Sequence, residues 1–388
     1  MTNYFCHAIH SIPEQSALYL KADTYPLEGM MTPRADQLYR NPRLELQTRP
    51  LDKLAEGNIR VQMEYVGICG TDIHIATADP ITGYVQSSAP AILDQTGRIL
   101  GHEGVGRILE VADNVQHLKV GQLVAFESIL TCGHCEQCRK GRYNQCEQAK
   151  LVGMEIDGLF SNILDLPAKL AFDVTDFIGS EGGIQAAACL EPAGVGFIAC
   201  ENAQIKPGDS VAVLGAGPIG LLTVMLAKSF GASKVTLVEP IDFRRNFASQ
   251  WADICYTPEE FQESANKYDV LIDAAGALHL VADSLKKINP NGRVVLLARN
   301  GQSMIIDKVD LLITNNISIV GARGHLGGIY EKVSKLYLAN RLPMHQIITK
   351  NIFGLEELTA YIENSQLVTQ ENCKVMCRLN QHDNEIVA

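Results

Sequence analysis

From about residue 195, short apolar segments alternate with helix-like segments along the chain. Parallel strands need a crossover between them, and strands buried on both faces are apolar along their length. The alternation therefore predicts an α/β fold, with a parallel sheet covered by helices on both faces. The expected strands are 210–215, 234–240, 268–276 and 293–298, and the expected helices are 218–231, 244–252 and 278–288.

The rest of the chain has a different pattern. Residues 58–70 and 106–126 mix β-branched residues with Gly and Asn turns, which is typical of short strands joined by loops. After about residue 325 the alternation stops, and 331–343 and 374–379 are expected to be a helix and a final strand. The chain has 388 residues, which is enough for about two domains, and one of them should be β-rich.

Charge and composition narrow the class of protein. The formal net charge of −11 repels phosphate backbones and argues against nucleic acid as a partner. The sequence has no apolar run long enough to predict a membrane span, and its start lacks the pattern of a secretory signal. We therefore expect a cytoplasmic protein, in which the eleven cysteines favour metal binding over disulfide formation.

Four of these cysteines form a compact cluster, with two, two and seven residues between successive members. Thiolates at this density fit one tetrahedral zinc ion with no open position, although iron–sulfur clusters also use four cysteines. Such a metal orders a loop, here about residues 131–147, that is too short to form its own core. We expect a structural zinc ion bound by Cys132, Cys135, Cys138 and Cys146.

The first expected strand of the alternating region leads into a glycine-rich turn, GAGPIG at 215–220. Such a turn between a strand and a helix is a dinucleotide-binding fingerprint, although it also occurs as a structural turn in other α/β folds. Gly215 allows the tight turn, Gly217 lets the backbone approach a pyrophosphate, and Gly220 lets helix and strand pack closely. Pro218 and Ile219 complete the expected cofactor-binding turn.

The second expected strand ends in Glu239, 19 residues after Gly220. A carboxylate at this place accepts hydrogen bonds from the ribose hydroxyls and repels a 2′-phosphate, which favours NAD over NADP. Arg244 and Arg245 follow closely, however, and a nearby arginine holds the 2′-phosphate in NADP-binding proteins. The alternative is that both arginines are solvated on the helix.

Five motifs together resemble the zinc-containing medium-chain alcohol dehydrogenase family, nearer its polyol, butanediol and threonine dehydrogenase members. They are GICGTDIH at 67–74, GHEGVG at 101–106, the four-cysteine cluster, CLEPAGVG at 189–196 and GAGPIG at 215–220. The resemblance implies a GroES-like catalytic domain at 1–194 and 326–388, with a Rossmann domain inserted at 195–325. It also implies a homodimer or a homotetramer.

The same resemblance places a catalytic zinc ion on Cys69, His102 and Glu191, with Glu103 as a second carboxylate that ligates zinc in some states. One thiolate, one imidazole and one carboxylate leave a fourth position open for water or for a substrate oxygen. Taken singly, Cys69 is equally well explained as a small buried hydrophobic residue, and Glu191 as a solvated charge.

The resemblance further assigns proton transfer to Thr71 and His74, and orientation of the zinc-binding histidine to Asp72. The alternative for His74 is a histidine on a solvent-facing loop. Two further expectations concern the substrate and the cofactor. Arg323 and His325 could reach either of them, and Lys374 either approaches the pyrophosphate or lies on the surface.

The function expected from these residues is hydride transfer between a small secondary alcohol or polyol and NAD, with two zinc ions per chain. Zinc lowers the pKa of the bound alcohol, so that an alkoxide forms near neutral pH. The alternatives are an NADP-dependent carbonyl reductase, a regulatory relative without catalysis and a zinc-free quinone reductase.

Two departures from the family pattern are an N-terminal extension of about 25 residues and a longer stretch at 76–98. The stretch at 76–98 either reshapes access to the zinc, meets a neighbouring subunit or is a surface insertion without function.

Overall fold

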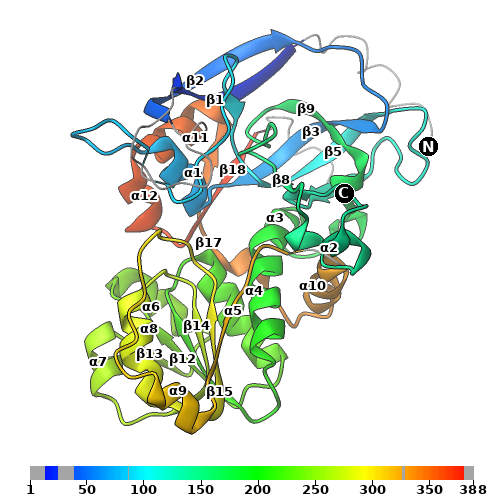
Figure 1. The fold of residues 1–388 in the computed structure, drawn as a ribbon. Helices are drawn as coiled ribbons and strands as arrows, with labels where there is room; N and C mark the ends of the chain where they lie inside the picture. Colours follow the sequence, from blue (N-terminus) through cyan, green and yellow to red (C-terminus); the bar gives the residue numbers. More distant parts are fainter. Residues whose placement is uncertain (1–13, 25–38, 86, 326–327, 380–388) are drawn as a thin grey trace.

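The computed structural model describes residues 14–24, 39–85, 87–325 and 328–379, which form a β-rich part and an α/β part (Figure 1). Residues 1–13 of the expected N-terminal extension lie outside the described residues. Among the residues that the structure describes, every helix is too short or too polar to span a bilayer.

The α/β part is a six-stranded sheet in which every neighbouring pair of strands is parallel. Apolar residues fill the strands, and the helices of the part pack around them, as the alternation predicts. In spatial order the strands are β13 (Ile254–Tyr256), β12 (Lys234–Val238), β11 (Ser210–Leu214), β14 (Tyr268–Asp273), β15 (Ile288–Leu296) and β16 (Ser318–Gly321). The helices that follow β11, β12, β13, β14 and β15 are α5 (Pro218–Ser229), α6 (Asp242–Ala248), α7 (Pro258–Glu263), α8 (Leu278–Ser284) and α9 (Asp310–Asn315).

Two strands of this sheet were not expected from the sequence. The outer strands β13 and β16 have three and four residues, which is too short for an apolar run to stand out. The predicted α/β class is nevertheless confirmed, because the four longer strands and their crossover helices lie where the alternation places them.

The β-rich part contains sheets in which neighbouring strands are mostly antiparallel, although β17 and β18 are parallel, and two separate segments of the chain contribute strands to it. A seven-stranded sheet has the order β10-β6-β5-β3-β18-β17, with β9 also paired to β3. Its strands are β3 (Asn58–Gly67), β5 (Glu103–Val111), β6 (Leu123–Phe126), β9 (Ile163–Pro167), β10 (Ala171–Asp173), β17 (Ile348–Phe353) and β18 (Lys374–Arg378). Because β18 pairs with β3, the C-terminal segment completes a sheet begun by the first part of the chain.

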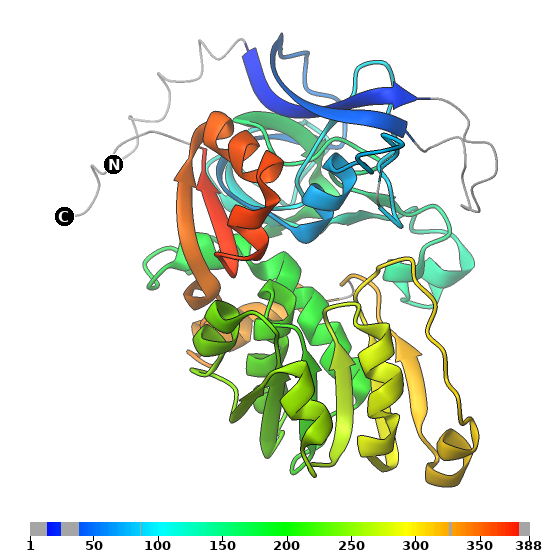
Figure 2. The ribbon, with the colours of Figure 1, turned by 90° about the vertical axis from the view of Figure 1, so that its left-hand side faces the viewer.

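The C-terminal helices α11 (Gly354–Glu363) and α12 (Ser365–Thr369) lie with the β-rich part in both views (Figures 1 and 2). A second, three-stranded sheet joins β1 (Glu14–Thr24), β2 (Tyr39–Pro50) and β4 (Arg98–Ile99). The stretch 76–98 packs on this sheet, since the Asn41 N–H donates to the Gly83 carbonyl and β4 pairs with β1.

Helix α4 (Leu190–Ala203) connects the two parts. Its buried apolar side chains, among them Leu190 and Phe197, belong to one core that includes Val105 of β5 and Val211 of β11. The domain boundary expected between residues 194 and 195 falls inside this helix, so the helix supports both sheets. It also carries Glu191 in its first turn, at the junction between the β-rich part and the α/β part.

Candidate active site

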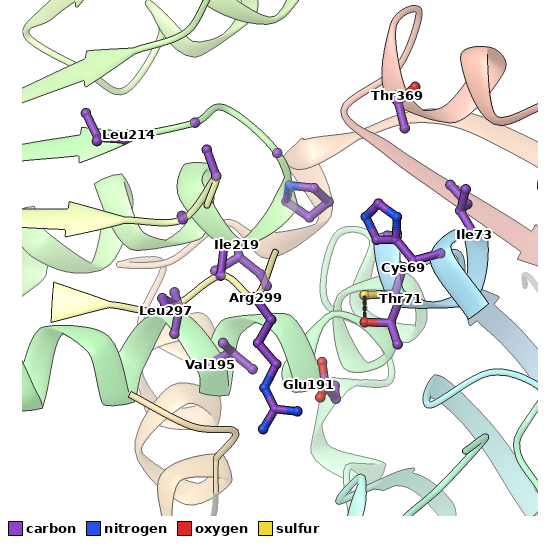
Figure 3. A pocket seen from close by; sticks show the side chains of 18 of the residues that line it. Cys69, Thr71, Ile73, Glu191, Val195, Leu214, Ile219, Leu297, Arg299 and Thr369 are labelled. Atoms are coloured by element: carbon purple, nitrogen blue, oxygen red, sulfur yellow. Dashed lines mark hydrogen bonds between the residues drawn. The ribbon is translucent and has the colours of Figure 1, made fainter. Parts of the chain in front are cut away.

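A cavity of about 730 Å³ lies between the two parts, and Figure 3 shows it from close by. The carboxyl ends of parallel strands are the usual place for a ligand in open α/β sheets. The cavity is lined by the expected ligands of the catalytic metal, by the two expected proton-transfer residues and by every expected cofactor residue except Gly220, namely Cys69, Thr71, His74, His102, Glu103, Glu191, Gly215, Gly217, Pro218, Ile219, Glu239 and Arg244.

Three of the expected zinc ligands come together on the β-rich wall. Cys69 directly precedes α1 (Gly70–Ala76), whereas His102 and Glu103 stand at the start of β5. One ligand atom from each of the three residues lies within 4.8 Å of the others. Pairing of β3 with β5 brings these segments together, because Gly67 lies opposite Glu103. The thiolate, imidazole and carboxylate donors fit a zinc ion.

Asp72 lies beside His102, as expected, but does not hydrogen-bond it. Its Oδ2 accepts a hydrogen bond of 2.9 Å from the Cys69 backbone N–H, and its Oδ1 lies 3.6 Å from His102 Nδ1. That distance is too long for a hydrogen bond, and both atoms are buried without such a partner among the described residues. Burial raises the pKa of Asp72, and the neighbouring His102 opposes this shift.

Glu191 faces the same cavity from α4 but lies outside the group of three (Figure 3). Its Oε1 accepts a hydrogen bond of 2.9 Å from Ser128 Oγ and lies 3.3 Å from His325 Nε2. Burial alone would raise the pKa of Glu191, but hydrogen bonding to His325 and Ser128 and the charges of His325 and His102 lower it to about 2. The carboxylate is therefore held ionised at the cavity wall.

The two partners of Glu191 were not assigned this role from the sequence. Ser128 follows β6 in a segment without a recognisable motif. His325 was expected to reach substrate or cofactor, but it is fully buried and its ring stacks on Tyr330 at a centroid distance of 4.8 Å. That expectation is wrong, because the imidazole lies behind Glu191 rather than along the cavity wall.

Lys374 also differs from expectation, since it neither lies on the surface nor points toward the glycine-rich turn. It is fully buried, forms an ion pair with Glu103, and donates a hydrogen bond of 2.9 Å to the Ile68 carbonyl. Gly67 makes room for this pair, because a Cβ there would lie 2.7 Å from Glu103 Oε2 and from Lys374 Nζ. In the sequence, the only indication of this buried position is that Lys374 is the first residue of the apolar strand β18.

The two residues expected to relay protons both border the cavity. Thr71 Oγ1 lies 3.8 Å from Cys69 Sγ, in the first turn of α1 (Figure 3). His74 lies further along the same helix and is exposed. Helix α1 therefore presents a hydroxyl beside the candidate metal site and an imidazole toward solvent.

The four clustered cysteines converge around one point in the β-rich part. Their sulfur atoms all lie within 4.8 Å of one another, and none forms a disulfide. The backbone N–H groups of Cys132, Cys135 and Gln148 donate to cysteine sulfurs at 3.4 Å. Backbone N–H groups also lower the pKa of Cys135 to about 6, which favours the thiolate. Four thiolates in this arrangement fit a tetrahedral zinc ion.

The glycine-rich turn has the geometry that a dinucleotide site needs. Gly215 has a φ of +97°, which favours glycine, and a Cβ on Gly220 would lie 1.9 Å from the Gly215 carbonyl oxygen. A Cβ on Gly217 would meet nothing within 4 Å. The backbone of Gly217 is thus open to the cavity at the start of α5.

Glu239 stands at the end of β12, where its carboxylate is held by two backbone amides. Ala216 N–H donates to Oε2 at 2.7 Å, and Ile241 N–H donates to Oε1 at 2.9 Å. Arg244 donates to the Asn372 and Val368 carbonyls, and Arg245 donates to the Glu239 and Pro240 carbonyls. Neither arginine is therefore simply solvated on its helix.

Known proteins match both parts of the chain. Residues 55–176 match the alcohol dehydrogenase GroES-like domain family, and residues 218–339 match the zinc-binding dehydrogenase family. The chain is 30% identical to a scyllo-inosose 3-dehydrogenase of Thermotoga maritima, over 88% of this chain and 91% of that protein. It is 31% identical to an L-threonine 3-dehydrogenase of Pyrococcus horikoshii, over 81% of this chain and 89% of that protein.

The fold has solved relatives as well. A structure from Thermotoga maritima described as that of an alcohol dehydrogenase superposes with a TM-score of 0.84 at 28% identity, covering 95% of this chain and all of that one. Sequence and fold therefore agree with the five motifs, and the chain belongs to the zinc-containing medium-chain alcohol and polyol dehydrogenases, as a zinc-dependent oxidoreductase that uses a nicotinamide cofactor.

Proposed function

We propose that the chain oxidises a secondary alcohol or a polyol with NAD, between a catalytic domain at 1–194 and 326–388 and a Rossmann domain at 195–325. One observation carries the proposal: Cys69, His102 and Glu191 line the same cavity as the glycine-rich turn and Glu239. Zinc would supply a Lewis acid that lowers the pKa of the alcohol, and NAD would accept the hydride.

The catalytic zinc ligands that we propose are Cys69, His102 and Glu191. Glu103 is neutralised by Lys374, so it stays with that ammonium group rather than serving as a resting ligand. Glu191 has one oxygen held by Ser128 and His325, whereas Oε2 makes no hydrogen bond within the described residues. That second oxygen is free to approach a metal bound by Cys69 and His102, and the fourth position is left for substrate.

Thr71 and His74 are the residues that we propose for proton transfer. The Thr71 hydroxyl lies beside the candidate zinc site, where it can accept a proton from the substrate hydroxyl. His74 is exposed on the same helix, where its imidazole can pass a proton to water. The cofactor ribose would connect the two groups in a bound complex.

The preference for NAD rests on Glu239. This carboxylate is held in place by two amides on the cavity wall, where it would face an adenosine ribose and repel a 2′-phosphate. The guanidinium groups of Arg244 and Arg245 are engaged by backbone carbonyls, which leaves less capacity for a phosphate. An NADP-dependent reductase is therefore the less favoured alternative.

We also propose a second, structural zinc ion on the four cysteines, a cytoplasmic location and a homodimer or homotetramer. Free thiols throughout the described residues favour a reducing compartment.

Strand β16 forms one edge of the parallel sheet, and Ile305 and Ile313 nearby are each 73% exposed. An open strand edge beside exposed apolar side chains favours association with a second copy. Light scattering of the purified protein measures the number of subunits.

Metal analysis combined with kinetics tests the proposal. The purified protein should contain two zinc ions per chain, and Cys69→Ala should contain one and lose dehydrogenase activity. Diols, sugar alcohols, cyclitols and amino alcohols are screened by the absorbance of reduced cofactor, with NAD and NADP compared on each substrate. A single zinc ion that survives Cys69→Ala, or a strong preference for NADP, would show the assignment to be wrong.

A further inference from the structure

Arg299 is a positive group in the cavity that the proposed reaction does not use. It follows the end of β15 by three residues, is exposed, and lines the cavity. Figure 3 shows its side chain extending past Val195 toward Glu191. Within the described residues, its guanidinium group makes no hydrogen bond or ion pair.

Three other charged groups of the cavity wall have partners within the protein. Glu103 is paired with Lys374, Glu239 accepts from two amides, and Arg244 donates to carbonyls. Arg323, which also lines the cavity and is exposed, adds a second guanidinium group without a partner among the described residues. Two guanidinium groups on the cavity wall, those of Arg299 and Arg323, are therefore left without a partner among the described residues.

The position of Arg299 separates it from the phosphates of the cofactor. The glycine-rich turn follows β11, and the carboxylate proposed for the adenosine ribose follows β12. Arg299 follows β15, which lies two strands from β11 on the side away from β12. Two strand spacings amount to about 10 Å, so Arg299 lies toward the nicotinamide and substrate end of an extended dinucleotide.

From this position we propose that Arg299 binds an oxyanion on the substrate, which is then a polyol bearing a carboxylate or a phosphate group rather than a neutral polyol. The inference rests on the proposed function, because it names the substrate class of that same site. A guanidinium group suits this role, since its planar donors bind either oxyanion through two parallel hydrogen bonds.

The test compares matched substrates on the zinc-loaded enzyme. A panel of hexitols is assayed with NAD beside the corresponding aldonates, in which a carboxylate replaces one terminal CH₂OH group, and beside the hexitol monophosphates. We expect one anionic series to be preferred, and Arg299→Gln to lower its kcat/KM about 10- to 100-fold, mainly through KM. Arg299→Lys should retain part of the preference, and the difference between the two anionic series identifies the oxyanion.

Two controls distinguish an oxyanion site from a general effect of lost charge and from a contact with the cofactor. Arg341→Gln removes an exposed arginine outside the cavity and should change neither series. The Kd of NADH for Arg299→Gln should equal that of the wild type; a weaker Kd would assign the arginine to the cofactor and overturn the inference. Equal use of neutral and anionic substrates, or an unchanged preference in Arg299→Gln, would also overturn it.

Absence of turnover with every compound would count against the proposed function and not by itself against the oxyanion site. Calorimetric titration of the enzyme–NADH complex with the aldonates and the hexitol monophosphates then decides the inference. Binding by the wild type that is lost in Arg299→Gln would support it. Binding that is undetectable, or equal in the two proteins, would overturn it.

Discussion

Replacement of Lys374 by methionine should destabilise the β-rich part while leaving the parallel sheet intact. Lys374 is fully buried and Glu103 is 1% exposed, so the carboxylate would lose its counter-ion without gaining water. Burial alone would lower the pKa of Lys374, but the Glu103 charge raises it, so the ammonium group stays charged at neutral pH. Removing one member of a buried ion pair costs about 3–5 kcal/mol.

The structure also predicts how the loss is recovered. In the double variant Glu103→Gln/Lys374→Met neither charge remains, so at least ~2 kcal/mol of the loss should return, less the cost of a buried amide. Both variants are made in a Cys69→Ala background, so that a bound zinc ion does not replace the missing positive charge. Glu103→Gln alone completes the double-mutant cycle.

Hydrogen exchange followed by mass spectrometry measures the loss of stability in the strands that surround the Lys374–Glu103 pair. Peptides from β3 and β18 report the local free energy of opening around the pair. Fluorescence of Trp251, the single tryptophan, is the internal control because this residue precedes β13 in the parallel sheet. A loss below about 1 kcal/mol in Lys374→Met, or a double variant as unstable as the single one, would refute the argument from an uncompensated charge.

Three further predictions concern the other parts of the site. Gly220→Ala should distort the glycine-rich turn and lower the melting temperature, since its Cβ would lie 1.9 Å from a backbone carbonyl oxygen. Gly217→Ala should fold normally and only weaken NADH binding. Thermal melts and fluorescence titration with NADH distinguish the two variants, and equal stability would contradict the prediction. Cys138→Ser should remove one of two zinc ions and raise hydrogen exchange within 131–147, and an unchanged zinc content would refute the four-cysteine site. Ser128→Ala should weaken the catalytic zinc about 10- to 100-fold in competition with a chromophoric chelator, because Glu191 loses the hydrogen bond that orients it, and an unchanged affinity would rule out this role.

The class of fold and the local motifs of the candidate site could be predicted from the sequence. Apolar strands separated by helical crossovers predict a parallel sheet independently of the other segments of the chain. The glycine spacing of GAGPIG likewise predicts a turn between a strand and a helix. The four cysteines likewise specify their own site, because all of them lie within fifteen residues. These features are local, so neighbouring residues already carry the information.

Tertiary structure alone decided which side chains support the site. Lys374 meets Glu103 across 271 residues of sequence, and His325 meets Ser128 across 197. No local pattern encodes such contacts, because they depend on the pairing of β18 with β3 and on the position of α4 between the two sheets. A lysine at a strand start or a histidine in a loop has no specific partner until those elements are packed, and only then does burial require that each charge be matched.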